Sequence, residues 1–242
     1  ISHLHGDQAV GLIGLLSSFA LLNRIQPLHV YGPPELERVL ELQFRLSDTH
    51  LPYPFTFHPI TADGLVLDSK NYTVECFSTK HRIECRGFIV REKKNLRKVV
   101  PEIAAIHQIP ASFFPNLQRG EDFVQTDGTV VANHLVTREN TKPRSYAFTA
   151  DTIYDPRLID IVRQVDLLYH ETTYPHALTD KAEARFHSTT KQAASIALQA
   201  GVKKLIIGHF SAKFEDIQQF EEEAKEVFEQ TEVATEGVTY LI

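Results

Sequence analysis

The feature that most constrains this chain is the string His3-Leu4-His5-Gly6-Asp7-Gln8, which stands just ahead of an apolar run at residues 9–22. The apolar run predicts a buried helix, so the string lies at a turn into that helix. Two imidazoles and a carboxylate at alternate positions converge on one point only where the backbone turns sharply, and Gly6 permits such a turn. Imidazole and carboxylate suit Zn²⁺ as ligands. The string therefore predicts a metal site, although alone it also fits structural histidines.

Further polar residues of the same kind stand at the ends of predicted strands, where α/β proteins collect their functional residues. Strands are expected up to about Phe77, over 146–149, over 165–170 and over 205–208. The side chains that follow or end these strands are His81, Asp151, Glu171 and His209, and His187 precedes a helix expected over 189–200 and ended by Gly201. So many such residues in one chain are hard to explain as structural histidines alone.

Composition excludes several other classes of protein. The chain has 242 residues, 43% hydrophobic and 23% charged, with a net charge of −6, which is typical of a globular domain. No apolar run reaches the ~18 residues of a membrane span. Two cysteines cannot brace a domain of this size, which indicates a reducing compartment. The acidic total argues against indiscriminate nucleic-acid binding but leaves room for a local basic site.

Such a basic site is expected next to and within residues 92–143. Residues 80–98 hold eight Lys or Arg against two Glu, and Asp127-Gly128 predicts a hairpin turn. The segment has too few apolar residues to build a core of its own, so we expect a projecting arm. The alternative is a solvated surface loop.

The remaining pattern alternates strands and helices. Helices are expected over 34–44, 156–164 and 216–230, and strands over 28–31, 55–57, 65–67, 72–74 and 87–90. The helix at 9–22 is apolar almost all round, which suits either the core or a dimer face, and we expect the core. Ile1-Ser2-His3 has the character of the end of a strand, which predicts earlier strands before Ile1.

Taken together, the motifs resemble the tRNase Z family of the metallo-β-lactamase superfamily. The resemblance rests on HLHGD at 3–7, KHRIECRGF at 80–88, TADT at 149–152, LLYHETTY at 167–174, HST at 187–189 and GHFSAKF at 208–214. It implies an α+β fold, the αβ/βα sandwich of two mixed sheets with helices outside. The whole chain, 1–242, would be a single domain of this kind with a tRNA-binding arm at about 92–143, and the first strands of the fold would precede Ile1.

The resemblance also implies roles for individual residues. His3, His5 and His81 would ligate a first zinc, Asp7 and His209 a second, and Asp151 would bridge the two. Asp7 would accept a proton from the water, and His187, oriented by Glu171, would protonate the leaving oxygen while metal-bound hydroxide attacks the phosphodiester. The residues expected to contact substrate are Ser211, Lys213, Lys93, Lys94, Arg97 and Lys98.

One departure from the family motif concerns the second zinc. The family has histidine where this chain has Gln8, and an amide oxygen is a poor zinc ligand, so we expect two zinc ions with a weakened second site. The implied activity is removal of the 3′ trailer from precursor tRNA by a cytoplasmic homodimer. Two alternatives stay open: another phosphodiesterase or arylsulfatase of the same fold, and a non-catalytic tRNA-binding subunit.

Overall fold

A computed structural model describes residues 1–242, and the chain divides into two compact units. The main unit comprises residues 1–91 and 144–242, and the inserted unit comprises residues 92–143. Each unit has its own buried apolar cluster or clusters, so each is described by itself.

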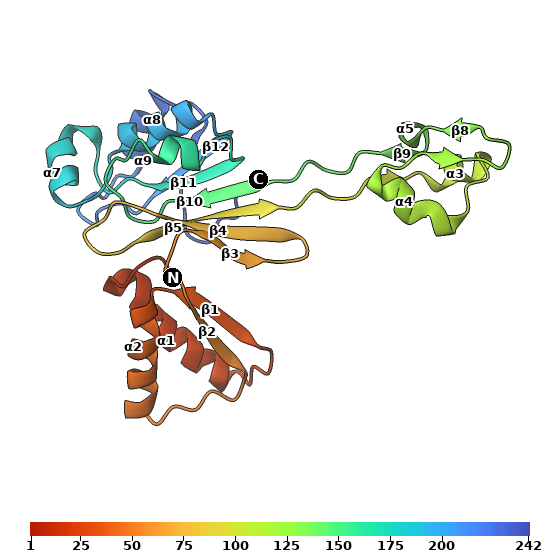
Figure 1. Cartoon of the computed structure of the whole chain (residues 1–242). Coiled ribbons are helices and arrows are strands. Elements are labelled where there is room, and N and C mark those ends of the chain that lie inside the picture. Colours follow the sequence, from red (N-terminus) through yellow and green to blue (C-terminus); the bar gives the residue numbers. More distant parts are fainter. The chain divides into compact units, whose positions relative to one another are not determined.

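The main unit is built on a seven-stranded sheet in the order β13-β12-β11-β10-β5-β4-β3 (Figure 1). Four neighbouring strands, β10 to β13, are parallel, whereas β10 with β5 and β3 with β4 are antiparallel, which makes the sheet mixed as expected. The strands are β3 (Gly64–Asp68), β4 (Tyr72–Ser78), β5 (Arg86–Glu92), β10 (Ser145–Phe148), β11 (Leu167–Glu171), β12 (Lys204–Gly208) and β13 (Thr231–Val233).

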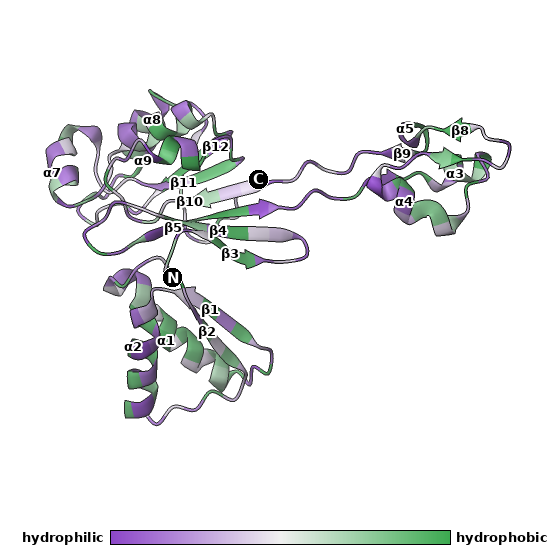
Figure 2. Cartoon of the chain, viewed as in Figure 1, coloured by the Kyte–Doolittle hydropathy of each residue, from purple (hydrophilic) through white to green (hydrophobic).

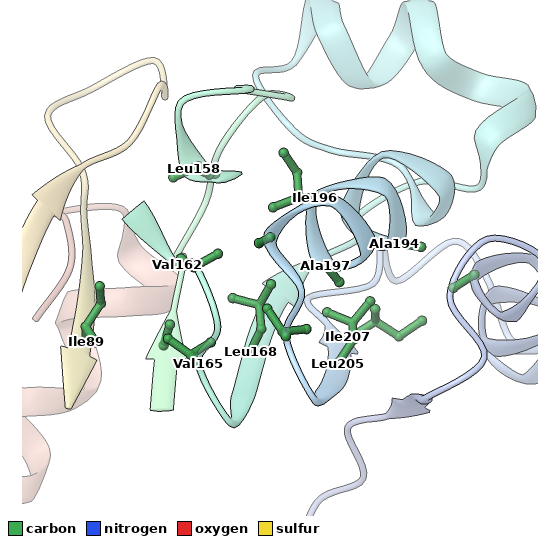
Figure 3. Close-up of a cluster of buried hydrophobic side chains, with 14 of the residues drawn as sticks. Ile89, Leu158, Val162, Val165, Leu168, Ala194, Ile196, Ala197, Leu205 and Ile207 are labelled. Atoms are coloured by element: carbon green, nitrogen blue, oxygen red, sulfur yellow. The ribbon is translucent and has the colours of Figure 1, made fainter. Parts of the chain in front are cut away.

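Helices pack on one part of this sheet and form its main core. Leu168, Leu205 and Ile207 of the sheet lie against the alanine-rich face of α8 (Thr190–Ala200), as Figure 3 shows. Thr189 and Gln192 form a capping box at the start of α8, and Gly201 ends it in the left-handed conformation at φ 64°. The helices α6 (Leu158–Ile161) and α9 (Gln218–Lys225) contribute Leu158, Phe220 and Ala224 to the same core. A 3₁₀ turn at His176–Leu178 and the short helix α7 (Thr179–Ala184) precede α8 in the chain.

Two helices in this region are shorter than the sequence predicts. Only Leu158–Ile161 is helical within 156–164, and the last helix ends at Lys225 instead of residue 230. The apolar pattern continues beyond both helices because Val162, Val227 and Phe228 pack into the same core from non-helical backbone. Apolar periodicity predicted the contacts there but not the backbone that makes them.

A second, smaller sheet pairs β1 (Leu28–Gly32) with β2 (Phe55–Pro59). These strands are parallel, so the expectation of two mixed sheets is wrong for this one. The helices α1 (Gly6–Leu21) and α2 (Pro34–Leu46) pack with it around Leu16, Leu36 and Leu40.

The helix α1 is less buried than its composition predicts. Only Ala9 and Leu16 are fully buried, whereas Val10 is 64% and Leu21 83% exposed. Figure 2 shows the hydrophobic character of this helix. The expectation of a core helix is therefore wrong for most of its surface, because a helix that is apolar all round does not reveal which face is packed. No helix in the structure has both the length and the apolar character needed to cross a membrane.

The inserted unit has a core, contrary to expectation. Ala104, Ile109, Leu117, Val131 and Val136 are buried together. They come from short elements without a clear repeat, which is why their pattern gave no signal in the sequence. These elements are β6 (Lys98–Val99), α3 (Pro101–Ile106), a 3₁₀ turn (Ala111–Phe113), α4 (Phe114–Arg119), β7 (Phe123–Val124), β8 (Val130–Val131), α5 (Asn133–Val136) and β9 (Thr137–Arg138).

Candidate metal centre

The first group of candidate ligands begins at the turn into α1. His5 is the residue before the helix, and its carbonyl accepts the amide N–H groups of Gln8 and Ala9. Residues 1–4 belong to no strand, although the Ser2 carbonyl accepts the amide N–H of Arg86 at 3.1 Å. The turn and this anchor direct both imidazoles toward the ends of the large sheet's strands.

Four side chains meet there: His3, His5, His81 and Asp151. His5 Nδ1 lies 3.1 Å from His3 Nε2 and 3.2 Å from His81 Nε2. Asp151 Oδ2 lies 3.6 Å from His3 Nε2 and 3.8 Å from His81 Nε2. Two ligands of a tetrahedral zinc, each about 2.1 Å from the ion, are about 3.4 Å apart. The four donor atoms therefore already have the spacing that one zinc ion requires.

Neighbouring groups leave the correct ring nitrogens available. His81 Nδ1 donates to the carbonyl of Phe186 at 2.9 Å, which leaves Nε2 as the bare nitrogen. His3 Nδ1 lies 3.1 Å from Ser2 Oγ and 3.4 Å from Cys85 Sγ. Such contacts fix the tautomer of a metal-binding histidine and orient its ring.

The pKa values of His3 and His81 favour the neutral form that binds a cation. Burial and the neighbouring His5 lower the pKa of His3 to about 4, and burial lowers the pKa of His81. Both rings are therefore neutral at pH 7 and hold an available lone pair. Burial removes water from the carboxylate of Asp151 and thereby raises its pKa. A cation bound beside the carboxylate would stabilise its charged form. This donor set fits zinc.

A second group shares Asp151 with the first. Asp151 Oδ1 lies 3.5 Å from His209 Nε2, which in turn lies 3.6 Å from Asp7 Oδ2. The two oxygens of Asp151 thus face different clusters, as a carboxylate that bridges two ions must. His209 Nδ1 is held by Thr173 Oγ1 at 2.9 Å. Gln8 Nε2 donates to Asp7 Oδ2 at 3.3 Å, so it contacts the carboxylate next to it.

His187 lies beside this second group and is held by Glu171. His187 Nδ1 is 2.8 Å from Glu171 Oε1, and its ring stacks on that of His209 with centroids 5.3 Å apart. Together with Asp151 and His209 it also forms a candidate ligand set. Although burial opposes the shift, the hydrogen bond to Glu171 raises the pKa of His187. This arrangement is suited to hold a proton at Nε2.

Glu171 is itself fixed by four donors. Its Oε1 accepts the Thr152 amide at 3.0 Å as well as His187, and its Oε2 accepts the amide of Thr173 at 3.1 Å and its hydroxyl at 2.8 Å. Burial opposes ionisation, but these donors and His187 lower the pKa of Glu171. The carboxylate is therefore a buried anion whose position is set by the loops after β10 and β11.

The other expected contact residues are placed less closely. Ser211 and Lys213 lie in the loop after β12, where the amide of Ser211 donates to the carbonyl of Thr173 at 3.2 Å and Lys213 is exposed. Lys93, Lys94, Arg97 and Lys98 all belong to the inserted unit. There a surface cavity of about 770 Å³ is lined by Lys94, Arg97, Arg119, Lys142 and Glu139, among other residues.

Sequence reasoning missed several residues that position the site. Cys85 Sγ lies 3.4 Å from His3 Nδ1, and Arg82 Nη2 lies 3.1 Å from His5 Nε2. Phe186 orients His81 through its backbone, and Thr173 orients both Glu171 and His209. Only the nearness of Arg82 and Cys85 to His81 in the chain offered a signal, because backbone carbonyls and threonines carry none.

Known proteins match this chain over nearly its whole length. No protein-family model matches it. A ribonuclease Z from Parabacteroides distasonis is 38% identical over 240 residues, which cover 98% of this chain and 79% of that protein. The chain belongs to the ribonuclease Z family. Another ribonuclease Z, from Porphyromonas gingivalis, is 40% identical over 238 residues, or 98% of this chain and 78% of that protein.

Solved structures similar to this member of the ribonuclease Z family agree on the fold. The short form of human tRNase Z has a TM-score of 0.63 at 24% identity, covering 97% of this chain and 74% of that one. A metallo-β-lactamase fold protein from Bacillus subtilis has a TM-score of 0.62 at 19% identity, covering 98% and 74%. The expected metallo-β-lactamase fold is thereby confirmed.

Proposed function

We propose that this chain is a zinc-dependent endoribonuclease that removes the 3′ trailer from precursor tRNA and leaves a 3′-hydroxyl on the tRNA. The observation that carries the proposal is the convergence of His3, His5, His81 and Asp151 at zinc-ligand spacing, in a chain of the ribonuclease Z family. The reaction replaces the bond between phosphorus and the 3′ oxygen by a bond to a water oxygen.

Two zinc ions per chain are the proposed cofactor. His3, His5 and His81 would hold the first, Asp7 and His209 the second, and Asp151 both. When bound, zinc supplies Lewis-acid chemistry: it lowers the pKa of water to ~7 and offsets negative charge on the phosphate. The direct contact of Gln8 with Asp7 supports a second site that binds its ion more weakly than the first.

The chain's own acid and base both lie beside His209, which contacts the carboxylate of Asp7 and stacks on the ring of His187. Asp7 accepts a proton from the attacking water. Although burial opposes it, hydrogen bonds from Gln8 and His209 lower the pKa of Asp7, so the carboxylate is ionised and available at neutral pH. His187 donates a proton from Nε2 to the leaving 3′ oxygen, while Glu171 stabilises its charged form.

The inserted unit is the proposed grip on tRNA. Its cavity brings four cationic side chains to one surface, and cations of this kind contact phosphates without reading bases. Lys94 and Arg97 of this cavity, together with Lys93 and Lys98 of the same unit, are proposed as phosphate contacts. Ser211 and Lys213 are proposed to lie near the scissile phosphate. In a cytoplasmic homodimer, the inserted unit of one subunit would hold the tRNA that the other cleaves.

The test compares precursor tRNA with small substrates. The zinc-loaded protein should release a trailer with a 5′-phosphate, and replacing Lys94, Arg97 and Lys98 with alanine should slow tRNA cleavage without affecting bis-p-nitrophenyl phosphate. Equal effects on both substrates, or preference for an aryl sulfate, would favour another hydrolase of the same fold. tRNA binding without turnover, with turnover restored by Gln8→His, would indicate a non-catalytic subunit.

A further inference from the structure

The residue directly before His187 has an unusual backbone conformation. Phe186 has a φ of 60°, in the left-handed region that bulky side chains rarely adopt. It ends α7 in a Schellman motif, in which its amide donates to Glu183 and the amide of His187 donates to Ala182. Glycine is the usual residue at this position, and this chain uses Gly120 and Gly201 after α4 and α8.

Packing of the Phe186 ring in a buried core does not offset the cost of this backbone conformation. Phe186 is 40% exposed and belongs to none of the three buried apolar clusters. The helix end requires only a left-handed residue, and the contact with His81 uses only the backbone carbonyl. Neither role needs an aromatic side chain. Non-glycine residues in such conformations cluster at ligand-binding and active sites. We therefore ask which ligand the exposed ring could contact.

The position of the ring limits what that ligand is. Its backbone carbonyl lies 2.9 Å from Nδ1 of His81, and the next residue is His187. In the proposed function, His81 would hold a zinc ion and His187 protonates the leaving 3′ oxygen, so the scissile phosphate lies close to both side chains. The nucleotides on either side of that phosphate are taken as unpaired. Unpaired bases are bound in proteins chiefly by stacking on aromatic side chains.

We propose that the exposed ring of Phe186 is a stacking platform for an unpaired nucleobase next to the scissile phosphate. The inference rests on the proposed function and adds a substrate-binding residue to it. The base belongs either to the nucleotide whose 3′ oxygen leaves or to the first nucleotide of the trailer. In both cases the ring aligns the phosphate with His187 and tolerates any base, because every base has a π-face.

The experiment is a double-mutant cycle on the zinc-loaded protein. Phe186→Gly removes the ring at a position that favours glycine, and Phe186→Tyr keeps the ring. Gln164→Gly is the matched control, because Gln164 is an exposed left-handed residue (φ 57°) remote from the metal ligands. Three precursor tRNAs are compared: one intact, one abasic on the 5′ side of the scissile phosphate, and one abasic on its 3′ side.

Phe186→Gly should raise KM for the intact substrate by about five- to 150-fold, the range of a single base-stacking contact. On one of the two abasic substrates the variant and the wild type should have equal KM, which identifies the stacked base. Phe186→Tyr and Gln164→Gly should behave as wild type. Zinc content and the urea midpoint of Phe186→Gly should not fall.

Other outcomes overturn the inference. If the effects of Phe186→Gly and of both abasic sites simply multiply, the ring stacks on neither base. If Phe186→Gly lowers the zinc content of the protein and lowers kcat equally on all three substrates, the residue acts only through His81. If the wild type cleaves tRNA and Phe186→Gly has the same kinetics, only the stacking platform is refuted. A wild-type protein that cuts no precursor tRNA refutes the proposed function as well.

Discussion

Replacing Glu171 with glutamine tests the electrostatics of the site most directly. The side chain keeps its shape but exchanges one carboxylate oxygen for an NH₂ group. That group must face either the amide of Thr152 or the amide of Thr173, both of which now donate to the carboxylate. The ring of His187 and the hydroxyl of Thr173 can change from hydrogen-bond donor to acceptor, but a backbone amide can only donate. One buried N–H therefore loses its acceptor, which costs about 1–3 kcal/mol.

The remaining cost depends on pH through the ion pair. The pKa of His187 is raised by the fold, so its contribution to stability is complete below its ordinary value of 6.5 and is lost as pH rises through the folded pKa. The pKa of Glu171 is lowered, so its contribution is complete above its ordinary value of 4.5 and is lost as pH falls through the folded pKa. The stability gap between wild type and Glu171→Gln should therefore be widest between these two values.

Urea unfolding at pH 3.5, 5.5 and 8.5 measures this gap, with a chelator present so that pH-dependent metal binding does not enter. The variant should be least stable relative to wild type at pH 5.5. In the zinc-loaded enzyme, the alkaline decline of kcat should begin at lower pH in the variant, because the pKa of His187 falls when its anionic partner is removed. A gap below about 0.5 kcal/mol, or one independent of pH, would refute the assignment of Glu171 as the ionised partner of His187.

Three further outcomes are expected. Asp7→Ala should abolish turnover with little loss of tRNA affinity in filter binding, and an active variant would exclude Asp7 as the proton acceptor. Gln8→His should strengthen binding of the second zinc in equilibrium dialysis, whereas unchanged zinc binding would show that Gln8 does not limit that site. Replacing Lys94, Arg97 and Lys98 with alanine should make the slope of log affinity against log salt shallower by about 0.7–0.9 for each phosphate that the variant no longer neutralises, and an unchanged slope would place the tRNA grip elsewhere.

The sequence was most informative where chemistry and strand ends coincide. His81, Asp151 and His209 were selected because each follows a predicted strand, and parallel strands bring their carboxyl ends to one edge of a sheet. This topology brings Asp151 and His209, after β10 and β12, to one edge. His3 and His5 reach the same edge from the turn into α1, next to the contact between Ser2 and Arg86. Local pattern failed where packing is irregular, because the core residues of the inserted unit share no repeat. It also could not show which face of the apolar helix α1 stays exposed.

Backbone conformation explains the part of the site that no pattern predicts. Of the non-glycine residues with positive φ, Ala150 precedes Asp151, Phe186 precedes His187, and His209 is itself a candidate ligand. Each stands just after an ordered element, β10, α7 or β12, whose hydrogen bonds hold the strained residue in place. Such a conformation costs of order 1–3 kcal/mol, and it turns the following side chain sharply away from the direction of the strand or helix. Because side-chain identity at 150 and 186 says nothing of this turn, sequence reasoning named the candidate residues but not the backbone that directs them.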